Sequence, residues 1–134
     1  MLDINRKNEI SLNLLKLQLN NSIAGTSYLS IPHGLIDLTK KEWNIYVKQS
    51  IASSTSNFGR VYLCSDNSNL TLAQNGYYLQ VGEANATDAI RLFKLQAGIS
   101  TQICAGIDGQ IANSFISSVR VKRNAIGDWE LAVD

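Results

Sequence analysis

Apolar and polar residues alternate along most of this 134-residue chain, and this alternation constrains its fold more than any other feature. In residues 42–49, for example, Trp43, Ile45 and Val47 fall on one side of an extended chain and the polar residues on the other. No long stretch repeats its apolar residues at helical spacing. The pattern therefore predicts strands with one buried face.

Nine short strands are expected, separated by turns rich in Gly, Asn and Ser, with the one proline after the second strand. They are 10–19, 27–31, 42–49, 60–65, 77–81, 89–95, 101–107, 117–121 and 129–133. This many short strands without a helix predicts an all-β, antiparallel two-sheet sandwich of jelly-roll type, with residues 1–134 as a single domain. Trp43 and Trp129 each alternate in phase with aliphatic residues, so both are expected in the core.

The composition agrees with a β-rich domain and excludes two classes of partner. Asn, Ser and Thr, which favour turns and strand faces, make up 33 of the 134 residues. Twelve basic and eleven acidic residues leave a net charge of +1, so no nucleic acid is expected as a partner. The uncharged stretches are too short and too polar for membrane insertion. The first residues mix charges and lack a secretory signal pattern, so the protein is either cytoplasmic or has lost such a signal.

The sequence offers little for a metal or a cofactor, and we expect neither. Cys64 and Cys104 are the only cysteines, too few for a zinc site, and the sequence leaves open whether they form a disulfide or remain free. A calcium site is a weaker alternative. It would draw on oxygen donors in the loops, namely Asp66, Asn67, Asn69, Asn85 and Asp88.

Residues for catalysis are equally sparse, and we predict that the protein is not an enzyme. His33, the only histidine, lies in a turn without an evident nucleophile or carboxylate partner, so a structural or solvent role is expected. Glu83 and Asp88 flank one loop and are the only carboxylates that suggest a glycosidase pair. The simpler interpretation is that Asp88 bonds loop amides while Glu83 is solvated or pairs with Arg91. Arg120 and Lys122 share a strand face, typical of a solvated side.

One possible binding face emerges from the aromatic residues outside the predicted core. Tyr46, Tyr62, Tyr78 and Phe93 all fall on the outer phase of their strands, close in sequence to basic residues. If the four strands share one sheet, they form an aromatic and basic patch suited to stacking on a sugar or packing against a neighbouring domain. The candidate ligand-binding residues are Tyr46, Tyr62, Tyr78, Phe93, Arg60 and Arg91.

From Leu17 onward the sequence resembles a known β-sandwich module. The resemblance is carried by several motifs together, among them Arg60-Val61-Tyr62-Leu63, Asn75-Gly76 with Tyr77 to Glu83, Asp88 to Phe93, Ile103-Cys104 and Gly127-Asp128-Trp129. The module is the concanavalin-like domain found near the start of large secreted surface proteins of Bacteroidota, which often also carry lamin-tail-like domains. Two features depart from it: no acidic, aromatic segment precedes Ile10, and the module usually continues past the position of Asp134.

The resemblance implies a jelly-roll sandwich in a secreted or cell-surface protein, and a chain that is part of a longer one. The leading function hypothesis is a non-catalytic surface or interaction module whose partners are neighbouring domains of the same chain or surface glycans. The alternatives are a carbohydrate-binding module that uses the aromatic outer face, and a glycoside hydrolase fragment with Glu83 and Asp88 as acid and base.

Overall fold

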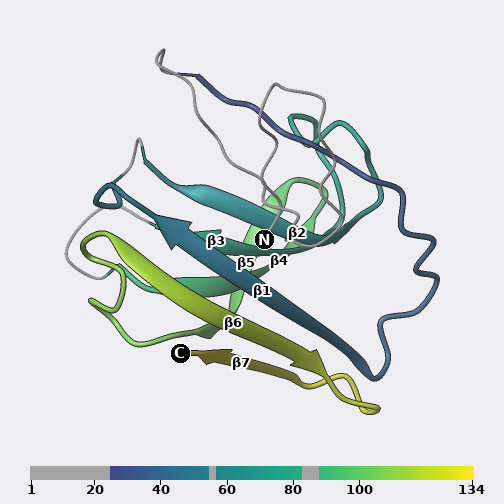
Figure 1. Cartoon of the computed structure of the whole chain (residues 1–134). Coiled ribbons are helices and arrows are strands. Elements are labelled where there is room, and N and C mark those ends of the chain that lie inside the picture. Colours follow the sequence, from purple (N-terminus) through teal and green to yellow (C-terminus); the bar gives the residue numbers. More distant parts are fainter. Residues whose placement is uncertain (1–24, 55–56, 83–87) are drawn as a thin grey trace, which may run out of the picture.

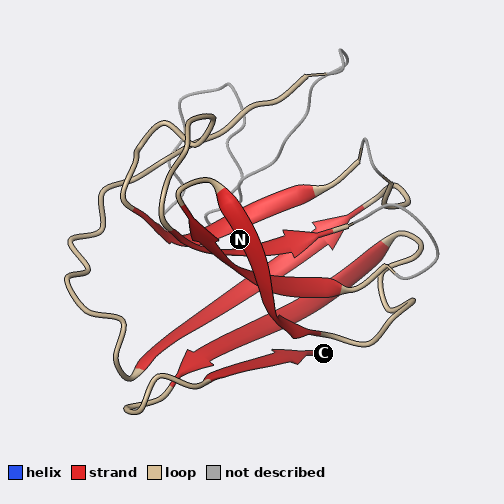
Figure 2. Ribbon diagram, turned by 180° about the vertical axis from the view of Figure 1, so that it is seen from behind, coloured by secondary structure: helices blue, strands red, loops and turns tan. Residues whose placement is uncertain are grey.

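The chain folds into two antiparallel sheets that face each other. The computed structural model describes residues 25–54, 57–82 and 88–134, and in these residues there are seven strands and no helix. The strands are β1 (Lys41–Gln49), β2 (Gly59–Ser65), β3 (Gly76–Val81), β4 (Ile90–Gln96), β5 (Ile99–Ala105), β6 (Phe115–Arg123) and β7 (Trp129–Val133). One sheet has the order β1-β6-β7 and the other β2-β3-β4-β5. Figure 1 shows the three-stranded sheet in front of the four-stranded sheet, and Figure 2 shows both from behind. The predicted all-β, two-sheet fold is confirmed.

The strand connections differ between the two sheets. The four-stranded sheet is a sequential meander, in which each strand pairs with the next along the chain. Ala97 and Gly98 make the tight turn from β4 to β5, with φ of 49° and 82°, as the right-handed twist of a hairpin requires. In the three-stranded sheet, β1 pairs with the distant β6 in a register that runs from Lys41↔Arg123 to Gln49↔Phe115. The chain between β1 and β6 forms the whole of the other sheet, so this pairing joins the two ends of the described fold.

Both sheets contribute to one apolar core. Leu79 and Leu92 of the four-stranded sheet are fully buried, and so is Val121 of the three-stranded sheet. Trp43 and Trp129 are half-buried, pack against this core, and stack with ring centroids 5.9 Å apart. The predicted inward phase of both tryptophans is therefore confirmed.

The segment before β1 differs from the prediction. Residues 27–31 do not form a strand, and Figure 1 shows this segment passing outside the strands before the chain enters β1. Tyr28, Leu29 and Ile31 are all exposed, so the alternation here brings no burial that would stabilise a sheet pairing. The other missing strand, at 10–19, lies outside the described residues.

The loop between β2 and β3 is folded back onto the four-stranded sheet. Asp66 accepts hydrogen bonds from the Asn75 backbone N–H at 2.7 Å and from its side-chain amide at 2.6 Å. β3 then begins at Gly76, where a Cβ would overlap the carbonyl oxygen of Cys64, so the close approach of the two strands requires glycine. This closure places Gln74, itself buried, beside the hydroxyl of Tyr62, to which its amide donates at 3.4 Å.

Candidate functional site

Three of the four candidate aromatic residues form a row across the four-stranded sheet. Tyr62 of β2 is opposite Tyr78 of β3, and Tyr78 is opposite Phe93 of β4. Directly opposite residues share a face, and this face points away from the core, since Leu79 and Leu92 on the alternate phase point inward. We call Tyr62, Tyr78 and Phe93 the aromatic row. The predicted clustering therefore holds for these three residues.

The rings of the aromatic row pack on one another instead of facing solvent. Tyr78 and Phe93 stack with centroids 5.2 Å apart and planes at 14°, and Tyr62 lies 5.3 Å from Tyr78 at 37°. The Tyr78 hydroxyl donates to Ser100 Oγ at 2.9 Å, and the Arg60 guanidinium lies 4.8 Å from the Tyr78 ring centre. Tyr78 is only 1% exposed. A sugar platform needs a free ring face, and Tyr78 has none to offer.

The two candidate arginines flank the aromatic row and are engaged within the sheet. Arg60, Gln80 and Arg91 form a second cross-strand row, in which the Arg60 Nε donates to Gln80 Oε1 at 3.3 Å. Arg91 forms an ion pair with Asp108 at 2.9 Å, and its side chain is 15% exposed. The sequence did not identify Asp108 as this partner, because Asp108 follows β5 and reaches Arg91 only through the β4–β5 pairing. The predicted partner Glu83 lies outside the described residues.

Tyr46 stands apart from the other candidate residues, because it belongs to β1 of the three-stranded sheet. The expectation that the four aromatic strands share one sheet is therefore not met for Tyr46. Its side chain points outward opposite Ser118 and is 44% exposed. Ile116 lies diagonally from it on β6 and is 57% exposed. Tyr46 is thus the one predicted aromatic contact residue on an open sheet face.

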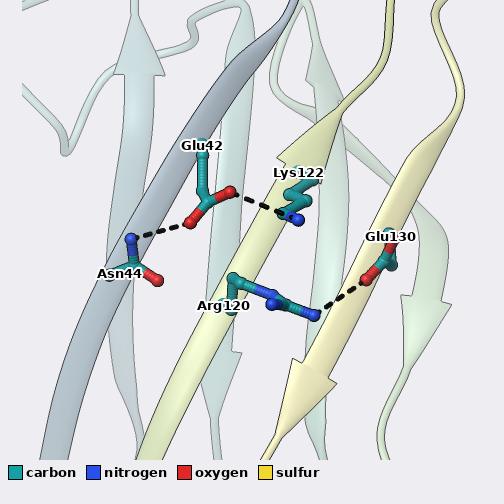
Figure 3. A network of polar contacts seen from close by, with 5 residues as sticks. All are labelled: Glu42, Asn44, Arg120, Lys122 and Glu130. Atoms are coloured by element: carbon teal, nitrogen blue, oxygen red, sulfur yellow. Dashed lines mark hydrogen bonds and ion pairs between the residues drawn. The ribbon is translucent and has the colours of Figure 1, made fainter.

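Charged side chains on this same outer face form cross-strand pairs, which Figure 3 shows from close by. Glu42 contacts Lys122 at 3.4 Å, and Arg120 contacts Glu130 at 3.2 Å. Glu42 also accepts a hydrogen bond from the Asn44 amide at 3.0 Å, and this bond, more than the nearby Lys122, lowers the pKa of the Glu42 carboxyl. The prediction that Arg120 and Lys122 share a solvated strand face is confirmed.

Two open hollows lie at the end of the sandwich where β1 begins and β6 ends, and Arg123 lines both. The first, about 450 Å³, is lined by His33, the segment 35–38, and residues of β2 and β3. The second, about 570 Å³, is lined by Lys40, Lys41, Glu42, Lys122, Arg123, Asn124, Ala125, Asp128, Trp129 and Glu130. Nothing in the sequence patterns signalled this place, because it depends on the β1–β6 pairing.

Among the residues that the structure describes, neither His33 nor Asp88, both considered for catalysis, has a hydrogen-bond partner that would form a catalytic pair with it. His33 is exposed, and its Nδ1 accepts a hydrogen bond from the Leu35 N–H at 3.0 Å. Asp88 is 5% exposed, and its Oδ1 is buried without a hydrogen-bond partner. Its proposed catalytic partner Glu83 lies outside the described residues. A buried carboxyl away from the two hollows is poorly placed to meet a polysaccharide.

The residues considered for metal binding are similarly committed within their loops. Asp66 binds Asn75, and the side chains of Asn67 and Asn69 accept hydrogen bonds from backbone N–H groups two residues further on. Asn85 lies outside the described residues. Within residues 25–54, 57–82 and 88–134, no group of three or more His, Cys, Asp or Glu side chains is placed to hold a metal ion.

Cys64 and Cys104 are free and lie on opposite edges of the four-stranded sheet. Two strands separate them, which at about 4.8 Å per strand spacing puts their backbones about 14 Å apart, well beyond the reach of a disulfide. Burial raises the pKa of both thiols. The question that the sequence left open is therefore answered in favour of free thiols.

Comparisons with known proteins add no relative. No protein-family model, no curated protein and no solved structure matches this chain. In the part of the chain that the structure describes, no helix is long and apolar enough to cross a membrane.

Proposed function

We propose that this chain is a non-catalytic interaction module of an exported multidomain protein, which contacts a neighbouring domain through the outer face of the three-stranded sheet. The observation that carries this proposal is the pair of exposed apolar side chains Tyr46 and Ile116, because the other outward residues of β1 and β6 are polar. The exported setting rests on the resemblance of residues 17–134 to the surface-protein module.

The layout of this face supports the proposal. Interfaces between domains combine a small apolar centre with a polar rim, and tyrosine is enriched among the residues that contribute most to binding. Here Lys48 and Ser118 lie opposite the two apolar residues, and the ion pairs of Glu42 and Arg120 follow along the same strands. Because these pairs already hold their long side chains, a partner would meet a partly ordered surface, which lowers the entropy cost of docking.

The opposite sheet is a poorer contact surface. Its aromatic row is packed internally, with Tyr78 buried and the guanidinium of Arg60 above its ring. Binding through these rings would require the row to open. A role for the row in packing therefore agrees better with its geometry than a role in ligand stacking.

A second candidate function, carbohydrate binding, uses the same face. Tyr46 has an exposed ring, and Asn44 is two residues before it on the same side of β1. An open aromatic ring beside an amide and the nearby Arg120 suits a sugar, whose apolar face stacks while its hydroxyls form hydrogen bonds. Tyr46 is then the contact residue, in place of Tyr62, Tyr78 and Phe93.

Tyr46→Ala tests both candidates, with Tyr28→Ala as the matched control, since Tyr28 is 49% exposed and outside this face. Titration of each variant with the adjoining domains of the parent protein should show binding that Tyr46→Ala weakens about tenfold or more and Tyr28→Ala leaves unchanged. A neutral-glycan array read with the same variants distinguishes the second candidate: glycan binding that depends on Tyr46 would replace domain docking as the function.

Unchanged domain binding in Tyr46→Ala would refute the proposed face. Release of reducing sugar from a polysaccharide would refute the non-catalytic role altogether. Asp88→Asn serves as the control for that assay, because Asp88 is the described member of the suspected acid pair.

A further inference from the structure

At the β1–β6 end of the three-stranded sheet, the cations on the outer face form ion pairs with carboxylates, and the cations on the inner phase form none with a described residue. On the outer face, Lys122 and Arg120 each pair with a carboxylate of a neighbouring strand (Figure 3). Lys41 and Arg123 sit on the alternate phase, the one that carries Trp43 and Val121 toward the core. Across the residues that the structure describes, neither of these two cations has an ion-pair partner.

These two cations are directly opposite each other. The register pairs Lys41 with Arg123, and like charges in that position repel. The Nε of Arg123 is also buried without a hydrogen-bond partner. A buried donor without a partner is unfavourable, and so is a second cation beside it, and an acceptor with negative charge nearby would offset the repulsion between the two cations.

Arg123 is held in place by the β6–β7 hairpin. Its guanidinium lies 5.6 Å from the centre of the Trp129 ring. Gly127, with φ of 100°, is also close, since an added Cβ there would come within 3.2 Å of Arg123 Nη2. Tyr77 and Trp43 pack against the same indole. These contacts hold the guanidinium of Arg123 in an ordered position, which lowers the entropy cost of binding a ligand.

The carboxylates near these cations are already engaged. Glu42 and Glu130 belong to the outer-face pairs, and Asp128 accepts a hydrogen bond from the Asn124 amide at 3.0 Å. Asp37 lies near enough for Lys41 and Arg123 to lower its pKa slightly, but hydrogen bonds from the Thr39 hydroxyl and N–H are the larger cause. Lys40, at the rim, adds another cation and has a left-handed backbone with φ of 54°, an uncommon conformation for lysine.

We propose that the 570 Å³ hollow beside Arg123 and Trp129 binds the carboxylate of an acidic saccharide residue, with Arg123 and Lys41 as its charged partners. The planar fork of arginine matches a carboxylate, which can accept two parallel hydrogen bonds from it. The hollow is within the size range of small-ligand sites.

The lining favours a sugar acid over a polyanion. Glu42, Asp128 and Glu130 border the hollow and have oxygens that can accept further hydrogen bonds. Sugar hydroxyls donate to such oxygens, whereas a phosphate cluster or a run of acidic side chains would be repelled by them. A ligand with one carboxylate and several hydroxyls fits this lining, because its carboxylate can pair with Lys41 and Arg123 while its hydroxyls donate to the bordering carboxylates.

The hollow borders the face centred on Tyr46 at Glu42, Lys122 and Glu130, but Tyr46 and Ile116 do not line it, so its test does not depend on them. Calorimetric titration with galacturonate, which carries a single carboxylate, should show saturable binding at low salt, and galactose should show none. Lys41→Gln and Arg123→Lys should each weaken binding about tenfold, since each loses a charge-assisted hydrogen bond. Lys94→Gln removes an exposed lysine of β4 outside the hollow and is expected to bind like the wild type.

Three results would overturn the proposal: absence of galacturonate binding to the wild type, equal binding by Lys41→Gln and the wild type, or inorganic phosphate binding as tightly as the uronate. Arg123→Lys retains the charge, so weaker binding by that variant identifies the fork of Arg123 as a recognition element in addition to its charge. Lys41 is the first residue of β1, so the binding measured for Lys41→Gln remains informative even if changing Arg123 disturbs the packing of Trp129. Tyr46→Ala should leave this binding unchanged.

Discussion

Replacing Tyr78 by alanine tests whether the aromatic row is a packing element. Tyr78 is 1% exposed, lies between Tyr62 and Phe93, and donates its hydroxyl to Ser100. Burying an aromatic side chain of about 200 Å² at about 25 cal/mol per Å² contributes about 5 kcal/mol. A compact unfolded state lowers this figure by 10–40%, which leaves about 3 to 4.5 kcal/mol. Tyr78→Ala should therefore remove a large part of the stability of a domain this small.

The assay is urea unfolding followed by the fluorescence of Trp43 and Trp129, both of which pack against the core. Tyr78→Phe separates the hydroxyl from the ring, and should cost about 1 kcal/mol for the lost hydrogen bond. Tyr46→Ala is the matched control, because its ring is 44% exposed on the other sheet, and should cost about 1 kcal/mol or less. If Tyr78→Ala unfolds within about 1 kcal/mol of the wild type, the row is not a packing element and the argument against ligand stacking fails.

Three further predictions follow from local geometry. Gly76→Ala should destabilise the protein by about 2 kcal/mol or more, because the added Cβ would overlap the Cys64 carbonyl. Gly59→Ala is the control and should change the urea midpoint little, because no atom lies within 4 Å of the added Cβ. Equal urea midpoints for the two variants would refute this prediction. Hydrogen bonds from the Asn75 backbone and side chain hold the pKa of Asp66 below its usual 3.8. The ionised carboxylate of Asp66 therefore stabilises the folded state above pH 3.8, and this stabilisation is lost as the pH falls through the folded-state pKa. The stability difference between wild type and Asp66→Asn should therefore shrink from about pH 5 to about pH 2, and a constant difference would contradict this assignment. Because Cys64 and Cys104 are free, a reductant should leave the melting temperature unchanged, and a reductant-dependent melting temperature would indicate a disulfide. Both thiols should be alkylated slowly in the native state, since burial raises the pKa of each.

Local alternation predicted strand phases well. Trp43 and Trp129 lie on the inner face as expected, and Ile90 and Leu92 are the inward residues of β4. Phe93 and Leu95 lie on the alternate phase, although Leu95 is itself buried. These results follow because the two-residue period of a strand fixes which side chains share a face. The same rule failed at Tyr28, where the sequence alternates but the side chains remain exposed.

The composition of the candidate site was less accessible from the sequence. Alternation assigned Tyr46 and Tyr78 to outer faces, but it carries no information on which strands pair, so it could not separate Tyr46 from the aromatic row. It also could not reveal that Tyr78 is buried on an outer face, because that burial depends on cross-strand neighbours such as Phe93. The opposition of Lys41 and Arg123 likewise depends on a pairing between strands about 80 residues apart.

The stacked indoles of Trp43 and Trp129 give the native protein an optical signature. Aromatic chromophores 5.9 Å apart couple their electronic transitions, which produces paired bands of opposite sign in circular dichroism. These bands require β1 and β7 to keep their places on either side of β6, so their loss reports separation of these strands without an added label.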